Sequence, residues 1–250
     1  YAGIACDMEI IMEISRKYNI PVVEDAAQAI DSKYKNKYLG TIGSYGAYSF
    51  HETKNIIAGE GGMLVINDPK FSERAEIIRE KGTNRSMFFR GEVDKYGWVD
   101  IGSSFLPSDI IAAFLYAQLQ SIDSIQNRRK DIWKRYFTTL KPLEDKGFIN
   151  LALLPDHSTN NGHMFYIECL NVGVRSDLIN HLKKNNVLSV FHYLSLHKSE
   201  FFKQYYKNEQ LPNSDKFTDG LLRLPLFFEL SDSEIDKICS FIFSFFETLD

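Results

Sequence analysis

Hydrophobic positions in the first half of the chain change repeatedly between the spacing of a helix and that of a strand. Apolar residues recur every three or four positions after Asp7, which predicts a helix that ends near Asn19. Beyond it, the pattern predicts a strand that begins at Val22, further strands at 45–50 and 62–67, and helices at 69–82, 108–121 and 125–140. Such alternation is typical of an α/β fold with a mainly parallel sheet covered by helices.

The second half of the chain has the pattern of a smaller α/β unit. Strands are predicted at 163–170 and 187–193, and helices at 176–185 and from Ser231 onward. We place the domain boundary near residue 140, so that residues 1–140 belong to a larger domain and residues 141–250 to a small C-terminal domain. Two polar segments, 33–43 and 83–105, lack periodicity and are expected to be a loop or short hairpin and a long functional loop.

Composition narrows the class of protein. The 250 residues are 44% hydrophobic and 25% charged, as in a soluble globular protein, and the net charge of −4 disfavours nucleic acid and anionic membranes as partners. The apolar run near the C-terminus is too short to span a membrane. The three cysteines are far apart and form no disulfide pattern, which favours a reducing cytoplasm.

Polar groups follow two of the predicted strands in a combination that suits the cofactor pyridoxal phosphate (PLP). The carboxylate of Asp25 could pair with the ring nitrogen and keep it protonated. The amine of Lys54 could form a Schiff base with the cofactor's aldehyde and afterwards move protons. Gln28 is expected to hydrogen-bond the ring's 3-oxygen, and Ser49 could donate to the phosphate.

Each of these features has a simpler interpretation when taken alone. Glu24-Asp25 could be a polar strand end, and Lys54 could be one surface lysine among many. Gly59-Glu60-Gly61-Gly62 lacks the spacing of a phosphate-binding loop and is expected to form a tight turn. His192 and His197 are accompanied by no nearby carboxylate or cysteine, so no metal site is predicted. No nucleophile elbow supports a Ser-His-Asp triad.

The combination is more informative than its parts, because it resembles the sugar-nucleotide aminotransferases of the DegT/DnrJ/EryC1/StrS family. The motifs that carry this resemblance are Glu24-Asp25-Ala26-Ala27-Gln28, Ser49-Phe50-His51-Glu52-Thr53-Lys54-Asn55 and Gly59-Glu60-Gly61-Gly62, with further similarity at 79–86, 88–91, 94–96, 100–104, 190–193 and 222–226. The resemblance implies the PLP-dependent transferase architecture called fold type I, with a PLP-binding large domain and a small C-terminal α/β domain.

Roles for individual residues follow from this resemblance by matching position. It implies that Lys54 is the Schiff-base lysine, Asp25 the partner of the ring nitrogen, Gln28 the contact of the 3-oxygen and Ser49 a contact of the phosphate. Ser104 stands where many members have an asparagine that reaches the phosphate of the neighbouring subunit. A homodimer with active sites at the interface is therefore expected.

The resemblance also implies a reaction and its substrates. His192, Tyr193 and Arg90 are candidates to border a sugar-nucleotide. The expected reaction moves the amino group of L-glutamate, by way of PLP, to C4 of a dTDP-4-keto-6-deoxyhexose. Lys54 favours transamination, because family members with histidine in its place run a dehydration instead. Family members carry a long N-terminal segment before the part matched here, so an N-terminally truncated enzyme is expected. Amination at C3 of a related keto-sugar and a non-catalytic truncated remnant stay open.

Overall fold

The chain forms two compact units in a computed structural model that describes residues 1–206 and 210–248. The first unit contains Gly3–Ile125 and Asp156–Asn161, and the second contains Gln126–Pro155 and the chain from Gly162 onward. The boundary predicted near residue 140 lies inside a long helix, α5 (Ile122–Asp145), whereas the units divide in the first turn of that helix. The division into a large and a small domain at that residue stays a prediction.

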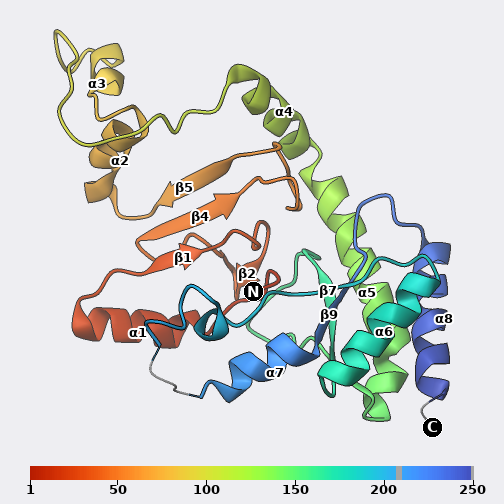
Figure 1. Ribbon diagram of the computed structural model, residues 1–250. Helices are drawn as coiled ribbons and strands as arrows, with labels where there is room; N and C mark the ends of the chain where they lie inside the picture. Colours follow the sequence, from red (N-terminus) through yellow and green to blue (C-terminus); the bar gives the residue numbers. More distant parts are fainter. Residues whose placement is uncertain (207–209, 249–250) are drawn as a thin grey trace. The chain divides into compact units, whose positions relative to one another are not determined.

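A three-stranded sheet organises the first unit (Figure 1). Its strands, in spatial order, are β1 (Val23–Asp25), β4 (Tyr45–Ser49) and β5 (Gly62–Ile66). Strands β1 and β4 are parallel, with Asp25 opposite Ala47, whereas β4 and β5 are antiparallel, with Ser49 opposite Gly62. The predicted α/β class is confirmed, but the sheet is mixed: residues 50–61 form a loop and not the helical crossover that a parallel neighbour requires.

Local sequence signals determine both ends of helix α1 and the start of helix α4. Asp7 caps α1 by accepting hydrogen bonds from the N–H groups of Glu9 and Ile10, and Asn19 ends that helix in the left-handed conformation, with φ of 51°. Ser108 caps α4 in the same way as Asp7. The remaining elements of the unit are α1 (Met8–Tyr18), β2 (Lys33–Tyr34), β3 (Lys37–Tyr38), the 3-10 helix η1 (Pro69–Phe71), α2 (Ser72–Arg79), α3 (Arg85–Phe89) and α4 (Asp109–Gln120).

The second unit contains a four-stranded sheet with the order β6-β7-β9-β8, antiparallel throughout. Ser231 and Glu234 form the expected capping box at the start of the last helix. The observed strands β7 and β8 are shorter than the strands predicted at 163–170 and 187–193. Elements β6, β9 and α7 were not predicted. The elements are β6 (Ile149–Leu151), β7 (Phe165–Cys169), α6 (Val172–Lys184), β8 (Val190–Phe191), the 3-10 helix η2 (Leu196–Lys198), α7 (Pro212–Gly220), β9 (Leu221–Leu224) and α8 (Asp232–Glu247).

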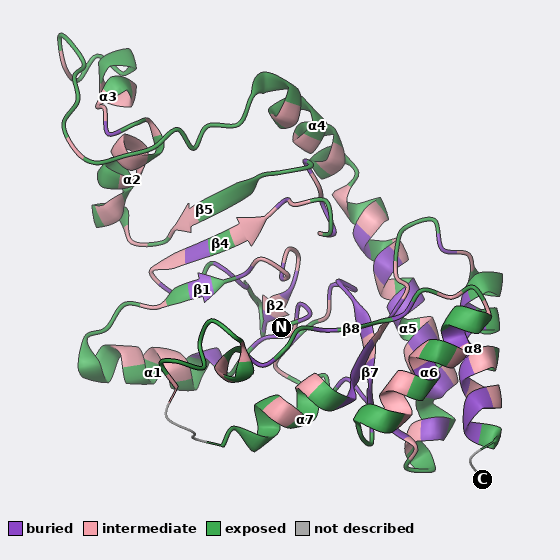
Figure 2. Ribbon diagram, in the orientation of Figure 1, coloured by how far each residue is buried: buried purple, intermediate pink, exposed green. Residues whose placement is uncertain are grey.

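Burial differs between the two units (Figure 2). In the second unit, strands β7 and β9 and helix α8 carry many buried side chains, including Phe165, Ile167 and Leu222 with no exposed surface. In the first unit, buried residues form smaller clusters, and helix α4 has no buried residue. In the part of the chain that the structure describes, no helix has the length and apolar composition needed to cross a membrane.

Candidate active site

The ends of β1 and β4 bring two candidate groups to the same edge of the sheet. Because these strands are parallel, their C-terminal ends lie on one side, where α/β sheets commonly bind ligands. Asp25 is the last residue of β1, and Ser49 ends β4 two positions beyond Ala47, the partner of Asp25. Lys54 follows in the turn after β4. The candidate residues of the first two motifs thus belong to neighbouring strand ends.

Adjacent carboxylates on β1 have different surroundings. Glu24 is buried, and its carboxylate accepts hydrogen bonds from the backbone N–H groups of Gly40, Ile42 and Gly43 at 2.6–2.7 Å. Asp25 points to the other face of the strand and is exposed; it accepts a hydrogen bond from the N–H of Ala27 at 3.1 Å. Glu24 therefore holds the loop before β4, and the carboxylate of Asp25 remains accessible.

The loop that carries Lys54 is anchored at both ends. Phe50 and Ile56 are buried in one hydrophobic cluster, and the N–H of Phe50 donates to the carbonyl of Gly61 at 2.8 Å. Between these anchors, the N–H of Lys54 donates to the carbonyl of His51 at 2.9 Å. The side chain of Lys54 is partly buried and forms no ion pair with any described residue. The amine is thus held on a fixed loop without a competing carboxylate.

A brace links this loop to the segment after β1. The side-chain nitrogen of Asn55 donates to the carbonyl of Asn161 at 2.8 Å. The side-chain nitrogen of Asn161 in turn donates to the carbonyls of Gln28 and Ile30 at 2.9 and 2.8 Å. Asn161, which has no exposed surface, was not identified from the sequence, because no local pattern signals a contact across more than 100 residues.

The segment that contains Ser104 lies close to the glycine motif. Ser104 pairs with Glu80 in an isolated β-bridge and is exposed. It lines a hollow of about 440 Å³ together with Glu60 and Gly62. Within one chain, therefore, Ser104 and the loop after Lys54 border a common space, and its predicted contact with a neighbouring subunit's phosphate stays a prediction.

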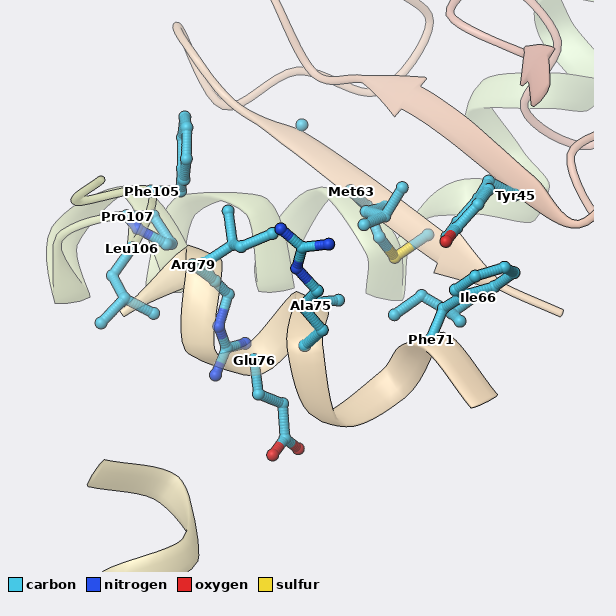
Figure 3. A pocket seen from close by; sticks show the side chains of 14 residues that line it. Tyr45, Met63, Ile66, Phe71, Ala75, Glu76, Arg79, Phe105, Leu106 and Pro107 are labelled. Atoms are coloured by element: carbon cyan, nitrogen blue, oxygen red, sulfur yellow. The ribbon is translucent and has the colours of Figure 1, made fainter. Parts of the chain in front are cut away.

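A larger hollow, of about 760 Å³, lies elsewhere in the first unit, between β5 and α2 (Figure 3). Apolar side chains that include Tyr45, Met63 and Phe71 line it, and Arg79 and Glu76 lie beside them. None of the candidate cofactor residues borders this hollow. We base the candidate site on the chemistry of the strand ends, because this hollow contains none of the candidate cofactor groups.

The second unit contains two of the substrate candidates. His192 is buried, and the centre of its ring lies 4.0 Å from that of Tyr193. Tyr193 is exposed and has a φ of 55°, a left-handed conformation that is costly for a bulky residue and that occurs often at functional sites. Their role toward a sugar-nucleotide stays a prediction.

The third substrate candidate, Arg90, already has partners. Its guanidinium donates to both carboxylate oxygens of Glu92, at 2.7 and 3.2 Å, and to Glu76 at 2.9 Å. The hydrogen bonds to Glu92 and then Glu76 raise the pKa of Arg90 above its ordinary value. This pairing favours a structural role for Arg90, and its predicted contact with substrate stays a prediction.

An α/β unit that presents a carboxylate, a hydroxyl and an amine beside parallel strand ends is typical of PLP-dependent transferases of fold type I, and comparison with solved structures shows this fold. The crystal structure of the aminotransferase TlmJ from Streptoalloteichus hindustanus matches with a TM-score of 0.87 and 26% identity, over all of this chain and 64% of that one. Solved neighbours include PLP and PMP (pyridoxamine phosphate) forms.

The chain belongs to the DegT/DnrJ/EryC1/StrS aminotransferase family, whose model matches residues 1–243. The protein MJ1066 of Methanocaldococcus jannaschii is 31% identical over 94% of this chain and 62% of its own length. The spore coat polysaccharide biosynthesis protein SpsC of Bacillus subtilis is 29% identical over 95% of this chain and 63% of its own length. The chain thus spans less than two thirds of the length of these curated relatives.

Proposed function

We propose that the chain is part of a PLP-dependent sugar-nucleotide aminotransferase that takes its amino group from L-glutamate. The observation that supports this proposal best is the shared strand edge, where Asp25 ends β1 and Ser49 ends the parallel strand β4, with Lys54 in the following turn. The family assignment supports the same class of reaction.

The chemistry of the donor set fits the cofactor. A carboxylate suits a pyridine nitrogen, a hydroxyl suits a phosphate and an amine suits an aldehyde. Neither Asp25 nor Lys54 forms an ion pair with another described residue, so both groups are available. When bound, PLP supplies an aldehyde that takes up amines and a ring that accepts electrons.

Each residue then has a defined task in the proposed reaction. Lys54 would hold the cofactor at its aldehyde carbon through Nζ and, once the substrate's amino group displaces it, would move a proton at Nζ. Asp25 would keep the ring nitrogen protonated through the charge of its carboxylate. Gln28 would contact the 3-oxygen, and the O–H of Ser49 would donate to the phosphate, with Ser104 as a further phosphate contact.

For the acceptor we propose a dTDP-4-keto-6-deoxyhexose, aminated at C4 to give dTDP-4-amino-4,6-dideoxygalactose. This sugar is used in surface polysaccharides such as lipopolysaccharide O-antigen and enterobacterial common antigen, and the role of SpsC in polysaccharide synthesis supports a sugar acceptor. His192 and Tyr193 would border the sugar-nucleotide, and the strained backbone of Tyr193 supports such a role. Amination at C3 and a non-catalytic remnant are the alternatives. The three free cysteines support a cytoplasmic location.

We further propose that the active assembly is a homodimer. Helix α4 is apolar on nearly all sides, a composition typical of a buried helix. Yet Ile110 and Tyr116 are 83% and 64% exposed. A second copy of the chain would cover this surface. Sedimentation velocity of the wild-type chain and of Ile110→Asp should then give a dimer and a monomer, respectively; a monomeric wild type would contradict the dimer.

The central test measures covalent attachment of PLP to Lys54. Addition of PLP to the purified chain is expected to produce the long-wavelength absorbance of lysine-bound PLP. Borohydride then adds hydride to the carbon–nitrogen double bond, with a proton from water on nitrogen, and leaves a stable secondary amine. Peptide mass spectrometry should place that label on Lys54. Lys54→Arg should lose both signals, whereas Asp25→Asn should keep the label and lose transaminase activity.

Activity with candidate keto-sugars then decides between the remaining alternatives. Product NMR is expected to place the new amine at C4; an amine at C3 would establish the alternative reaction. Labelled Lys54 without any turnover of keto-sugars would indicate a remnant that retains only cofactor binding. If the wild-type chain shows neither absorbance nor label, the proposed function is wrong for this chain.

A further inference from the structure

We infer that His51 is a positioning residue for Lys54, and that its ring closes the turn that presents the lysine by accepting a hydrogen bond at Nδ1. The inference rests on the proposed function, because it concerns how the amine of Lys54 is held toward PLP. No family assignment or comparison identifies His51 in this role.

The geometry of the turn carries the first step. The N–H of Thr53 donates to ring Nδ1 of His51 at 3.2 Å, and the N–H of Lys54 donates to the carbonyl of His51 at 2.9 Å. The N–H of His51 donates to the hydroxyl oxygen of Ser49 at 3.3 Å. Through its ring, carbonyl and amide, His51 therefore connects the candidate phosphate contact to the candidate catalytic lysine. A side chain that accepts the N–H two residues later stabilises a turn as an Asx turn does.

The contacts of Nδ1 bear on the tautomer of His51. An amide N–H can only donate, so the hydrogen bond from the N–H of Thr53 needs a lone pair on Nδ1. The hydroxyl of Thr53, 2.9 Å from Nδ1, can donate to the same lone pair. In a neutral ring the proton is then on Nε2. Nε2 lies 3.5 Å from a carboxylate oxygen of Glu60, a group that can accept its N–H. Glu60 of the glycine motif is thus on the Nε2 side of the His51 ring, and the backbone of the turn is on the Nδ1 side.

The position of Lys54 depends on this turn as well as on the brace through Asn55, because the residues directly before the lysine are outside the core. Phe50 and Ile56 are 3% and 0% exposed, whereas Glu52 and Thr53 between them are exposed. Without the ring acceptor, the N–H of Thr53 would turn to water, and the direction of the Lys54 side chain would no longer be fixed. We expect slower attachment of PLP and little change in the stability of the unit.

A matched set of substitutions separates the two ring nitrogens. The side-chain oxygen of Asn lies near the position of Nδ1, whereas that of Gln reaches farther, toward the position of Nε2. The rate of borohydride-trapped labelling of Lys54 should stay within about twofold of wild type in His51→Asn and should fall about threefold to tenfold in His51→Gln and His51→Ala. His181→Asn, in the other unit, is the control and should label at the wild-type rate. Thermal melting of each variant checks that it is folded.

A second measurement needs no cofactor. Two-bond proton–nitrogen correlation NMR of the labelled chain, with the His51 signal assigned by its loss in His51→Asn, is expected to show Nε2 protonated and Nδ1 unprotonated. A protonated Nδ1 would overturn the inference. Equal losses of labelling in His51→Asn and His51→Gln would also overturn it, while the proposed function would stand. If the wild type fails to label, the proposed function fails, and the NMR spectrum still decides the tautomer.

Discussion

The two sheets of the protein are built on different principles. The sheet of the second unit is lined by side chains such as Ile167 and Leu222, which have no exposed surface, and it packs against long amphipathic helices. The sheet of the first unit carries the polar candidates, while Val23, Met63 and Leu64 on its strands are 65%, 47% and 54% exposed. One sheet is a closed core, and the other holds chemical groups in place through hydrogen bonds to backbone.

This difference indicates how the first unit fixes the positions of its polar groups. Apolar burial is not directional, so it stabilises a unit without fixing the position of a single polar group. Glu24 and Asn161 accept from or donate to defined backbone atoms on both sides of the candidate site. Substitutions in the two units should therefore differ in both the size and the kind of their effects.

The largest effect is expected from Leu222→Ala in β9. Leu222 is fully buried, so the substitution removes apolar contacts and leaves a cavity, at a cost of about 2–5 kcal/mol. Urea unfolding followed by the fluorescence of Trp133, a buried residue of the same unit, measures this loss once Trp98 is replaced by Phe. A loss below about 1 kcal/mol would contradict the description of this sheet as the closed core.

Glu24→Ala should have the largest effect in the first unit. It leaves the N–H groups of Gly40, Ile42 and Gly43 without their acceptor, and we expect a loss of about 3 kcal/mol. Hydrogen exchange of peptides from residues 38–48 reports it. Glu24→Gln retains the shape and should lose about half as much. Asp25→Ala on the opposite face should leave exchange unchanged, and equal effects of the two alanine variants would contradict the division of β1 into a structural and a chemical face.

The sequence predicted these elements unequally. Helix α1 was predicted with both ends because Asp7 and Asn19 are local signals, and the capping box at Ser231 acts in the same way. Strand β9 was missed because Leu221-Leu222-Arg223-Leu224 is short and begins with two adjacent apolar residues. Helix α7 was missed because its short polar sequence has no clear apolar face.

The candidate site was predictable only in part, for the same physical reason. Asp25 and Lys54 stand in motifs that can be recognised along the chain. The brace through Asn161 and the buried acceptor Glu24 depend on contacts between segments that only the fold brings together. The antiparallel position of β5 likewise depends on how residues 50–61 turn back, which periodicity alone does not determine.

Asn161→Ala is expected to have an intermediate effect, since it removes two hydrogen bonds to the carbonyls of Gln28 and Ile30. We expect a loss of about 2 kcal/mol in the first unit. Hydrogen exchange in peptides that contain Ala29–Ser32 measures it. Asn161→Asp is the matched variant, because it keeps the volume but cannot donate, and it should be at least as destabilising. A variant with wild-type exchange would show that the brace contributes nothing.

Ser231→Ala tests a local signal in the second unit. The hydroxyl oxygen accepts the N–H of Glu234 at 3.3 Å, and the Glu234 side chain accepts the N–H of Ser231 at 2.8 Å. Loss of such a cap costs about 1 kcal/mol. Urea unfolding of the second unit should show that loss, and Ser231→Asp, which can still cap, should restore most of it. If Ser231→Ala leaves the free energy of unfolding unchanged, packing alone determines where helix α8 begins, and the cap contributes nothing.

The smallest effect is expected from Leu64→Ala in β5, the counterpart of Leu222→Ala in β9. The residue type is the same, but Leu64 is 54% exposed, so little apolar surface returns to water and the change should stay within about 0.5 kcal/mol. Hydrogen exchange across β4 and β5 measures it. A loss above about 1 kcal/mol would mean that this face is covered in solution. Sedimentation at several protein concentrations would then tell whether a second copy covers it, because a stability that rises with concentration requires association.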